Sequence, residues 1–197
     1  MKPIDYVRVI RDSAAPSPLV GEGAEHFTCC SRHVLFLILL LGLLPSRMAH
    51  AASEYELKAA FLYNFALYTE WPSSPASVRL CVLGRNPFGE SLTPLNHKNI
   101  RGASVSVSFI TTAAEARTCQ VLFIAASAHS KMPSIVTGLG DSPVLTVSEA
   151  NDYDSKTVMV VLATDNNRVS FDISQTVAQQ AGLKLSSQLL KLARQVQ

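Results

Sequence analysis

Charged residues are scarce in this 197-residue chain: Asp, Glu, Lys and Arg make up 16% of it, whereas apolar residues make up 48% and the mean hydropathy is +0.20. Such a composition excludes a disordered polar chain or an acidic tail. The 17 basic residues barely outnumber the 15 acidic ones, and no basic run is dense enough to follow a phosphate backbone. The sequence therefore predicts a folded protein with no nucleic-acid partner.

Long apolar runs are also missing, apart from eleven residues at 34–44. A helix of that length rises about 16 Å, roughly half the thickness of bilayer hydrocarbon. Ala49 and Ala51 follow it and offer the small side chains that signal peptidase requires. We therefore expect residues 1–51 to be a leader with a cleaved signal peptide and residues 52–197 to be one exported domain. The alternative is a retained membrane anchor.

Cysteine is rare, and two of the four cysteines lie ahead of the apolar run and would leave with the leader. Cys81 and Cys119 remain. Two cysteines in an exported protein predict one disulfide bond, which would stabilise the fold by roughly 4 kcal/mol on the chain-entropy estimate. Two separate buried thiols are the alternative.

Histidine is equally rare in 52–197, where only His97 and His129 occur. A zinc or copper site needs three or four soft or imidazole ligands, and the two cysteines are expected to bond with each other, so we expect no metal. Ser127 and His129 lie close together in sequence, but no G-x-S-x-G elbow or oxyanion loop accompanies them. The sequence therefore predicts a binding module with no catalytic residues and no cofactor, rather than an enzyme.

A capping box at Ser53 and Glu56 predicts a helix that starts at 54 and runs to Trp71, where Pro72 would stop it. Its predicted apolar stripe contains Leu57, Phe61, Asn64 or Phe65, and Tyr68. The helix carries more aromatic side chains than one stripe can bury. Two of them, Tyr55 and Tyr63, are candidate partner contacts, and the alternative is that they flank an ordinary core.

Short apolar runs alternate with short helix signals in the rest of the chain. The runs predict strands at 78–83, 104–110, 119–125, 144–147, 157–163 and 168–173. The last two form a predicted hairpin around 165–167, and helices are predicted at 127–139 and from Ser186 to Val196. This order predicts an α/β fold: a three-layer domain with a mainly parallel sheet, an antiparallel C-terminal hairpin and flanking helices.

Parallel sheets place ligands at the carboxyl ends of their strands, so the loops at 84–89, 125–131 and 148–154 are the expected binding region. Candidate partner or ligand contacts in or beside them are Arg85, Phe88, Ser127, His129 and Glu149. The segment at 84–89 lacks the glycines of a P-loop or dinucleotide site, so we interpret it as a turn in which Asn86 caps a helix. Arg85 is expected to pair with a carboxylate or a charged partner surface.

Five stretches resemble one known family when taken in order. They are KAAFLYNFALYTEWP, LCVLGRNPFG, CQVLFIA, VLTVSEA and VAQQAGLKLSSQLLKLA. In this order, after a signal peptide, they look like the YfiR family of exported proteins, the group called domain of unknown function 4154. The similarity covers about 53 to 196, and Cys81 and Cys119 match a family disulfide pair in position.

The resemblance implies a periplasmic regulator without catalytic activity. YfiR-like proteins restrain an inner-membrane diguanylate cyclase by binding its periplasmic sensor portion, and an outer-membrane lipoprotein relieves the restraint by sequestering the regulator. The output is the level of cyclic di-GMP, and hence biofilm. Well-known members carry a second cysteine pair, whereas this chain has no Cys after 119. A homodimer and a small-molecule sensor that contacts its ligand through Phe88, Ser127 and Glu149 are further alternatives.

Overall fold

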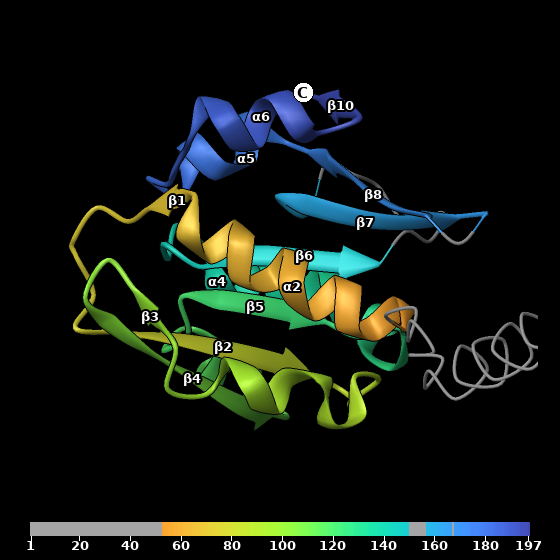
Figure 1. The fold of residues 1–197 in the computed structure, drawn as a ribbon. Helices are drawn as coiled ribbons and strands as arrows, with labels where there is room; N and C mark the ends of the chain where they lie inside the picture. The colour runs from red at the N-terminus through yellow and green to blue at the C-terminus, as the bar shows by residue number, and fades with distance from the viewer. Residues whose placement is uncertain (1–52, 150–156, 167) are drawn as a thin grey trace, which may run out of the picture. The chain divides into compact units, whose positions relative to one another are not determined.

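An eight-stranded sheet with helices on both faces forms the centre of the computed structural model, which describes residues 53–149, 157–166 and 168–197 (Figure 1). The described strands are β1 (Thr69–Glu70), β2 (Ser77–Leu83), β3 (Asn99–Ile100), β4 (Ala103–Ile110), β5 (Val121–Ile124), β6 (Leu145–Glu149), β7 (Val160–Asp165), β8 (Arg168–Ile173), β9 (Lys184–Leu185) and β10 (Gln195–Val196). The helices are α2 (Glu54–Leu67), η1 (Gly89–Leu95), α3 (Ala113–Ala116), η2 (Ala126–Lys131), α4 (Met132–Leu139), α5 (Gln175–Gln180) and α6 (Ser187–Leu192), of which η1 and η2 are 3₁₀ helices.

The main sheet has the strand order β10-β8-β7-β6-β5-β2-β4-β3. Strands β4, β2, β5, β6 and β7 pair in parallel, as do β8 and β10. Of the described pairings within this sheet, only β3 with β4 and β7 with β8 are antiparallel. The mainly parallel α/β fold with an antiparallel hairpin is therefore confirmed. Strand β1 pairs with β9 in a separate two-stranded ribbon.

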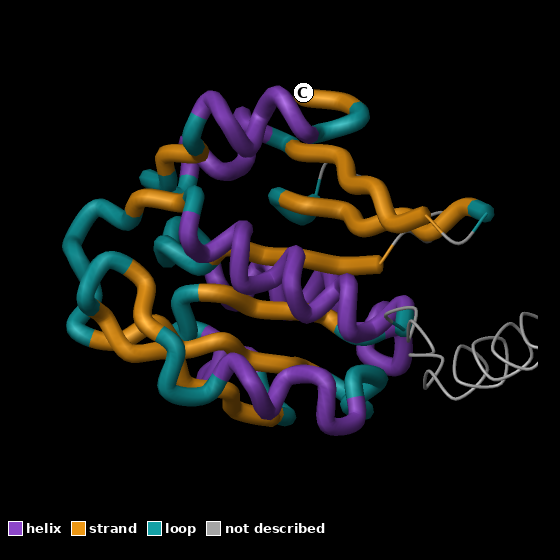
Figure 2. The backbone as a smooth tube through the Cα atoms, viewed as in Figure 1, coloured by secondary structure: helices purple, strands orange, loops and turns teal. Residues whose placement is uncertain are grey.

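Alternating side chains of the central strands supply two hydrophobic cores, one on each face of the sheet. In β2, Leu80 and Val82 belong to the core covered by α2, η1, α5 and α6. Cys81 and Leu83 belong to the core covered by α3, η2 and α4. Figure 2 shows α2 crossing one face of the strands with α4 behind them. Because β5 is buried at all four positions, it contributes to both cores, as expected of a central parallel strand.

The first helix is shorter than the sequence pattern predicts. It ends at Leu67 rather than at Trp71, because Thr69 and Glu70 leave the helix and pair with Leu185 and Lys184 of β9. The Thr69 hydroxyl donates a 2.7 Å hydrogen bond to the Phe65 carbonyl, which satisfies one of the acceptors at the helix end. This stop depends on a distant strand, since the paired residues Thr69↔Leu185 and Glu70↔Lys184 are 116 and 114 positions apart. Local sequence therefore could not reveal it.

The buried face of α2 also differs from the predicted stripe. Leu57 is 38% exposed, and the buried residues of the helix are Lys58, Ala59, Leu62, Phe65 and Ala66. Of the predicted stripe, Phe65 is fully buried, whereas Phe61 and Tyr68 are only partly covered. Apolar residues surround this helix on most sides, so the hydrophobic pattern alone does not fix its rotation. Lys58 lies on the buried face of the helix, where its ammonium meets the Glu149 carboxylate.

Three other local predictions are wrong in detail. The helix expected at 127–139 is divided at Met132 into η2 and α4, and Pro133 lies in the first turn of α4, where its missing N–H is harmless. The helix expected to reach Val196 ends at Leu192, because Gln195 and Val196 pair with β8. Asn86 caps no helix: its side chain accepts a 2.9 Å hydrogen bond from the Phe88 N–H, in a turn ahead of η1.

The predicted C-terminal hairpin is confirmed. Strands β7 and β8 pair from Val160↔Ile173 to Asp165↔Arg168, and Asn166 in the turn has φ 47°. Asn tolerates the left-handed region better than other non-glycine residues, so this turn was readable from the sequence.

Candidate functional site

An open hollow of about 280 Å³ lies at the carboxyl ends of β2, β5 and β6, whose arrowheads point the same way in Figure 1. Its lining residues are Tyr55, Arg85, Asn86, Pro87, Ala125, Ala126, Ser127 and Glu149. Four of the predicted contact residues therefore meet in one place: Tyr55, Arg85, Ser127 and Glu149. They come together because parallel strands end at the same edge of a sheet, with the start of α2 lying beside them.

A buried lysine organises the charges beside this hollow. Lys58 is only 4% exposed, and its ammonium lies 2.7 Å from the Glu149 carboxylate and 2.5 Å from that of Glu54. It also lies 4.7 Å from the centre of the Tyr55 ring, within the range of a cation–π contact. Two carboxylates face one ammonium, so the cluster carries one excess negative charge next to the hollow.

The pKa values of Lys58, Glu54 and Tyr55 are shifted in this cluster. Burial alone would lower the pKa of Lys58, but hydrogen bonds to Glu149 and Glu54 outweigh it and raise that pKa above its ordinary value. The hydrogen bond from Lys58, followed by one from Thr164, lowers the pKa of Glu54. Burial raises the pKa of Tyr55, and the negative charge of Glu149 raises it further. All three groups therefore keep their neutral-pH charge states over a wide pH range.

Arg85 and Ser127 join the loops after β2 and β5. The Arg85 backbone N–H donates a 2.8 Å hydrogen bond to the Ser127 hydroxyl oxygen, while the Arg85 side chain is exposed at the rim of the hollow. Gly84 makes this approach possible: its φ is +98°, and a Cβ there would lie 2.7 Å from Ser127 Oγ and 3.1 Å from Ala128 Cβ. The hydroxyl of Ser127 therefore holds the two loops together. Among the described residues, no general base is hydrogen-bonded to it.

Replacing Gly84 by Ala is expected to destabilise the protein by about 2 kcal/mol, because it adds backbone strain at positive φ to a clash with the 125–128 loop. Urea denaturation would measure the loss. The matched control is Gly140→Ala, where φ is +55° but no atom lies within 4 Å of the new Cβ. Equal losses in the two variants would show that the close approach of the loops contributes nothing.

Three predicted contact residues lie outside the hollow. Tyr63 is half-buried further along α2, and its hydroxyl donates a 3.0 Å hydrogen bond to the Asn99 carbonyl. Phe88 is buried in the core and contacts the rings of Tyr55 and Phe123 edge-on. His129 is 6% exposed on η2. As placed, Phe88 and His129 offer no surface to a large partner.

Sequence reasoning missed Lys58 as part of this site. The Glu54–Lys58 spacing of four residues on a helix was a visible signal for an ion pair. The contact with Glu149 had no such signal, because 91 positions separate the two residues. The third loop of the expected binding region, 148–154, lies largely outside the described residues.

Cys81 and Cys119 form a disulfide bond, with their Cα atoms 6.0 Å apart. Cys81 lies in β2 and Cys119 precedes β5, so the bond links two neighbouring parallel strands within the core under α3 and α4. Both residues are at most 1% exposed. The bond lies on the opposite face of the sheet from α2.

Within the described segments, no group of three metal-binding side chains comes together, and none of the helices has the length and apolarity needed to cross a membrane. The apolar run at 34–44 lies outside these segments. The hollow and its charged cluster thus offer polar and aromatic contacts, and the described part of the chain supplies no recognisable set of reacting groups.

The model of the YfiR/HmsC-like family, domain of unknown function 4154, matches residues 55–194. The chain belongs to the YfiR/HmsC-like family. The match begins at Tyr55 on the rim of the hollow and ends after α6, so it includes both cores and the disulfide. The resemblance carried by the five sequence stretches is therefore confirmed. This family is periplasmic and regulatory, acts in cyclic di-GMP signalling and is not characterised by a catalytic activity.

Two solved structures resemble this YfiR/HmsC-like domain distantly. One is an ABC domain in complex with L-Trp from Streptococcus pneumonia, and the other is a conserved domain protein from Vibrio cholerae O1 biovar El Tor. Each has a TM-score of 0.49 and 12% sequence identity, over 71% and 74% of this chain respectively. The chain spans 60% of the length of either structure. At this distance neither likeness extends to ligand or activity.

Proposed function

We propose that this protein inhibits an inner-membrane diguanylate cyclase by binding the cyclase's periplasmic sensor region, and so lowers cyclic di-GMP and biofilm. The observation that carries the proposal is the family match over 55–194, which spans nearly all of the described domain. An outer-membrane lipoprotein that sequesters the protein would release the cyclase. The leader predicted at 1–51 supports the same compartment, because an inhibitor that acts in the periplasm must be exported.

The carboxyl edge of the sheet is the contact surface that we propose for the cyclase. Arg85 is exposed there, beside a cluster with one excess negative charge, so the surface presents both signs of charge within one hollow. Such an arrangement favours a partner with complementary charges, since paired charges steer encounter and select the partner. Exposed aromatic area from Tyr55 would supply the apolar part of the contact.

Deleting the gene is expected to raise cellular cyclic di-GMP, measured by mass spectrometry of nucleotide extracts, and the wild-type gene should restore the original level. A gene carrying Arg85→Glu should restore it poorly, because the reversed charge would face the partner. The matched control is Lys191→Glu, the same reversal on exposed α6. An unchanged cyclic di-GMP level in the deletion strain across growth conditions would contradict the proposed function.

The partner itself can be identified by affinity capture. Tagged protein incubated with detergent-solubilised membranes should retain a diguanylate cyclase with a periplasmic domain, and Arg85→Glu should retain less of it than Lys191→Glu. If the wild type and both variants retained the cyclase equally, the proposed inhibition would stand, but the contact surface would lie away from Arg85. Failure to retain any cyclase would argue against direct inhibition.

A second candidate function is a periplasmic small-molecule sensor, which the 280 Å³ hollow favours because it joins Tyr55, Ser127 and Glu149 in one concave space. A thermal-shift screen distinguishes this function, since a ligand at 100 times its Kd adds about 2.7 kcal/mol to the free energy of unfolding.

A further inference from the structure

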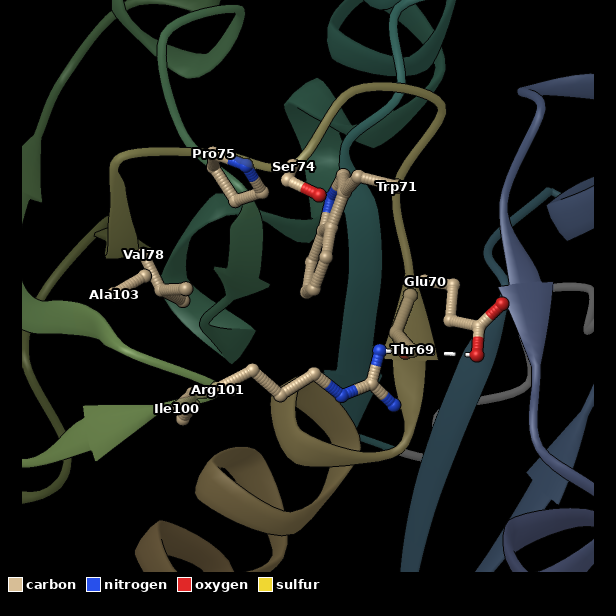
Figure 3. A pocket seen from close by; sticks show the side chains of 9 residues that line it. All are labelled: Thr69, Glu70, Trp71, Ser74, Pro75, Val78, Ile100, Arg101 and Ala103. Atoms are coloured by element: carbon tan, nitrogen blue, oxygen red, sulfur yellow. Dashed lines mark ion pairs between the residues drawn. The ribbon is translucent and has the colours of Figure 1, made fainter.

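Strand β4 forms one edge of the main sheet together with the short β3, and β3 covers only part of it. The pairs Asn99↔Ser104 and Ile100↔Ala103 join β3 to the first two residues of β4. Figure 3 shows Arg101, from the turn that joins these strands, reaching towards Glu70 across a cavity of about 230 Å³ beside Trp71. The amino end of β4 therefore lies against other parts of the chain.

Hydrogen bonds from the segment before β3 show which backbone groups of β4 face away from β2. The Val105 N–H donates a 2.7 Å hydrogen bond to the Lys98 carbonyl. Two residues further, the Val107 N–H donates a 2.9 Å hydrogen bond to the side-chain oxygen of Asn96. Alternate residues of a strand direct their N–H and C=O groups to the same side, so the backbone groups of Phe109 face outwards as well.

Three outward backbone groups have no hydrogen-bond partner in the described part of the chain: the Val107 C=O, the Phe109 N–H and the Phe109 C=O. We call this stretch, 107–109, the free edge of β4. It is held in register with β2 through Val82↔Phe109. Arg79 Nε also donates a 3.0 Å hydrogen bond to the Ser108 hydroxyl, which fixes the strand from the other side. The free edge is thus already extended and positioned for pairing.

An exposed aromatic side chain lies at the free edge. Phe109 is 57% exposed, and among the exposed large apolar side chains of the described residues it is the only aromatic one. Val107 lies on the same face of β4 and is only partly covered by the core. Strand β4 contains no charged residue and no proline, the residues that commonly prevent an edge strand from pairing with another chain. Apolar surface and open backbone groups therefore occur together.

We propose that the free edge of β4 binds an extended segment of the cyclase's periplasmic region by β-strand addition. The backbone of that segment would pair with the three open groups, and an apolar side chain of the segment would pack on Phe109. This inference rests on the proposed inhibition and deepens it. Phe109 lies opposite Val82, and Arg85 follows shortly after Val82, so the free edge continues the surface proposed for the cyclase.

A second copy of this chain would fit the free edge less completely. In an antiparallel pairing centred on Phe109, the two Phe109 residues would exchange their N–H and C=O groups. The Val107 C=O would then need the other copy's Thr111 N–H. That N–H already donates a 3.1 Å hydrogen bond to the Glu115 carboxylate. An independent segment can pair with all three open groups, which favours a partner protein over self-association.

Binding to the cyclase that the tagged protein retains, purified in detergent, tests the proposal. Phe109→Ala should weaken this binding at least about tenfold, the loss typical of a central aromatic contact. Phe109→Pro also removes the outward N–H, a change that an edge strand tolerates, and should weaken binding about a further fivefold. The matched control, Leu192→Ala, truncates another apolar side chain, 69% exposed on α6, and should bind as the wild type does. Equal midpoints of thermal unfolding would verify the fold of each form.

Amide exchange of the wild type distinguishes strand addition from a contact through the Phe109 side chain alone. The Phe109 N–H should exchange rapidly in the free protein and at least about tenfold more slowly in the complex, whereas the Val107 N–H, bonded to Asn96, should be protected in both. Unchanged exchange at Phe109, or wild-type affinity in Phe109→Pro, would overturn strand addition and leave the proposed inhibition standing. If the wild type binds no cyclase, both fail. A wild-type dimer in analytical ultracentrifugation that Phe109→Pro abolishes would assign the free edge to a second copy and overturn the proposal.

Discussion

Replacing Cys81 and Cys119 together by Ala is expected to lower the free energy of unfolding by about 4 kcal/mol. The bond closes a sequence separation of 38 residues, and its loss returns that loop's conformational freedom to the unfolded chain. Both cysteines are buried between β2, β5 and the α3–α4 layer, so small cavities add to the loss. Urea denaturation of the oxidised wild type and of the double variant would measure it.

Reduced wild-type protein distinguishes the contribution of the cross-link to stability from that of side-chain packing, because it keeps both sulfur atoms while the bond between them is absent. It should lose most of the same stability as the double Ala variant. A loss below about 1 kcal/mol in both cases would mean that the unfolded chain gains little freedom on reduction. Since the described domain holds this one pair, reduction would then have no structural route to weaken the fold through cysteine.

Replacing Lys58 by Met is expected to destabilise the protein by about 3 kcal/mol at neutral pH. The substitution leaves the Glu149 side chain, which is 15% exposed, without its cationic partner, and removing one member of a buried pair costs far more than the pair contributes. Lys191→Met on exposed α6 is the matched control and should change stability by less than about 0.5 kcal/mol. Thermal or urea unfolding would compare the two.

The pH dependence of the Lys58→Met effect has a defined window. The pKa of Glu54 is lowered below its ordinary 4.5 in the folded state, so its contribution is present above pH 4.5 and is lost as the pH falls through the folded value. The pKa of Lys58 is raised above 10.5, so its contribution is present below pH 10.5 and is lost as the pH rises further. The difference between wild type and Lys58→Met should therefore be greatest between these limits and should narrow outside them. A difference that does not vary with pH would assign the loss to packing alone.

Fold class and strand positions were predictable because they depend on local patterns. The continuous apolar run at β5 predicts a strand buried on both faces, and the turn at Asn166 predicts the β7–β8 hairpin. The predictions are wrong where contacts with residues far away in the sequence determine the local structure. The end of α2 depends on β9 and the end of α6 depends on β8, while Lys58 on the buried face of α2 pairs with the distant Glu149.

The candidate site was likewise predictable only in part. The rule that parallel sheets bind at the carboxyl ends of strands selected Arg85, Ser127 and Glu149, which the structure brings together with Tyr55. The pattern could not separate surface from interior for Phe88, since an aromatic after a turn is equally compatible with both. The cavity at Trp71 had no sequence signal, because its walls come from 69–78 and from 100–103, and nothing local links them.

The position of β2 in the sheet limits how early the chain can fold. Its two neighbours, β4 and β5, both follow it in sequence and pair with it in parallel, so β2 has no local hairpin to stabilise it. Its full pairing waits until residue 124 is available, which makes folding dependent on long-range contacts and therefore slow. A chain synthesised from its N-terminus therefore completes the core around β2 only after the segment up to residue 124 has emerged.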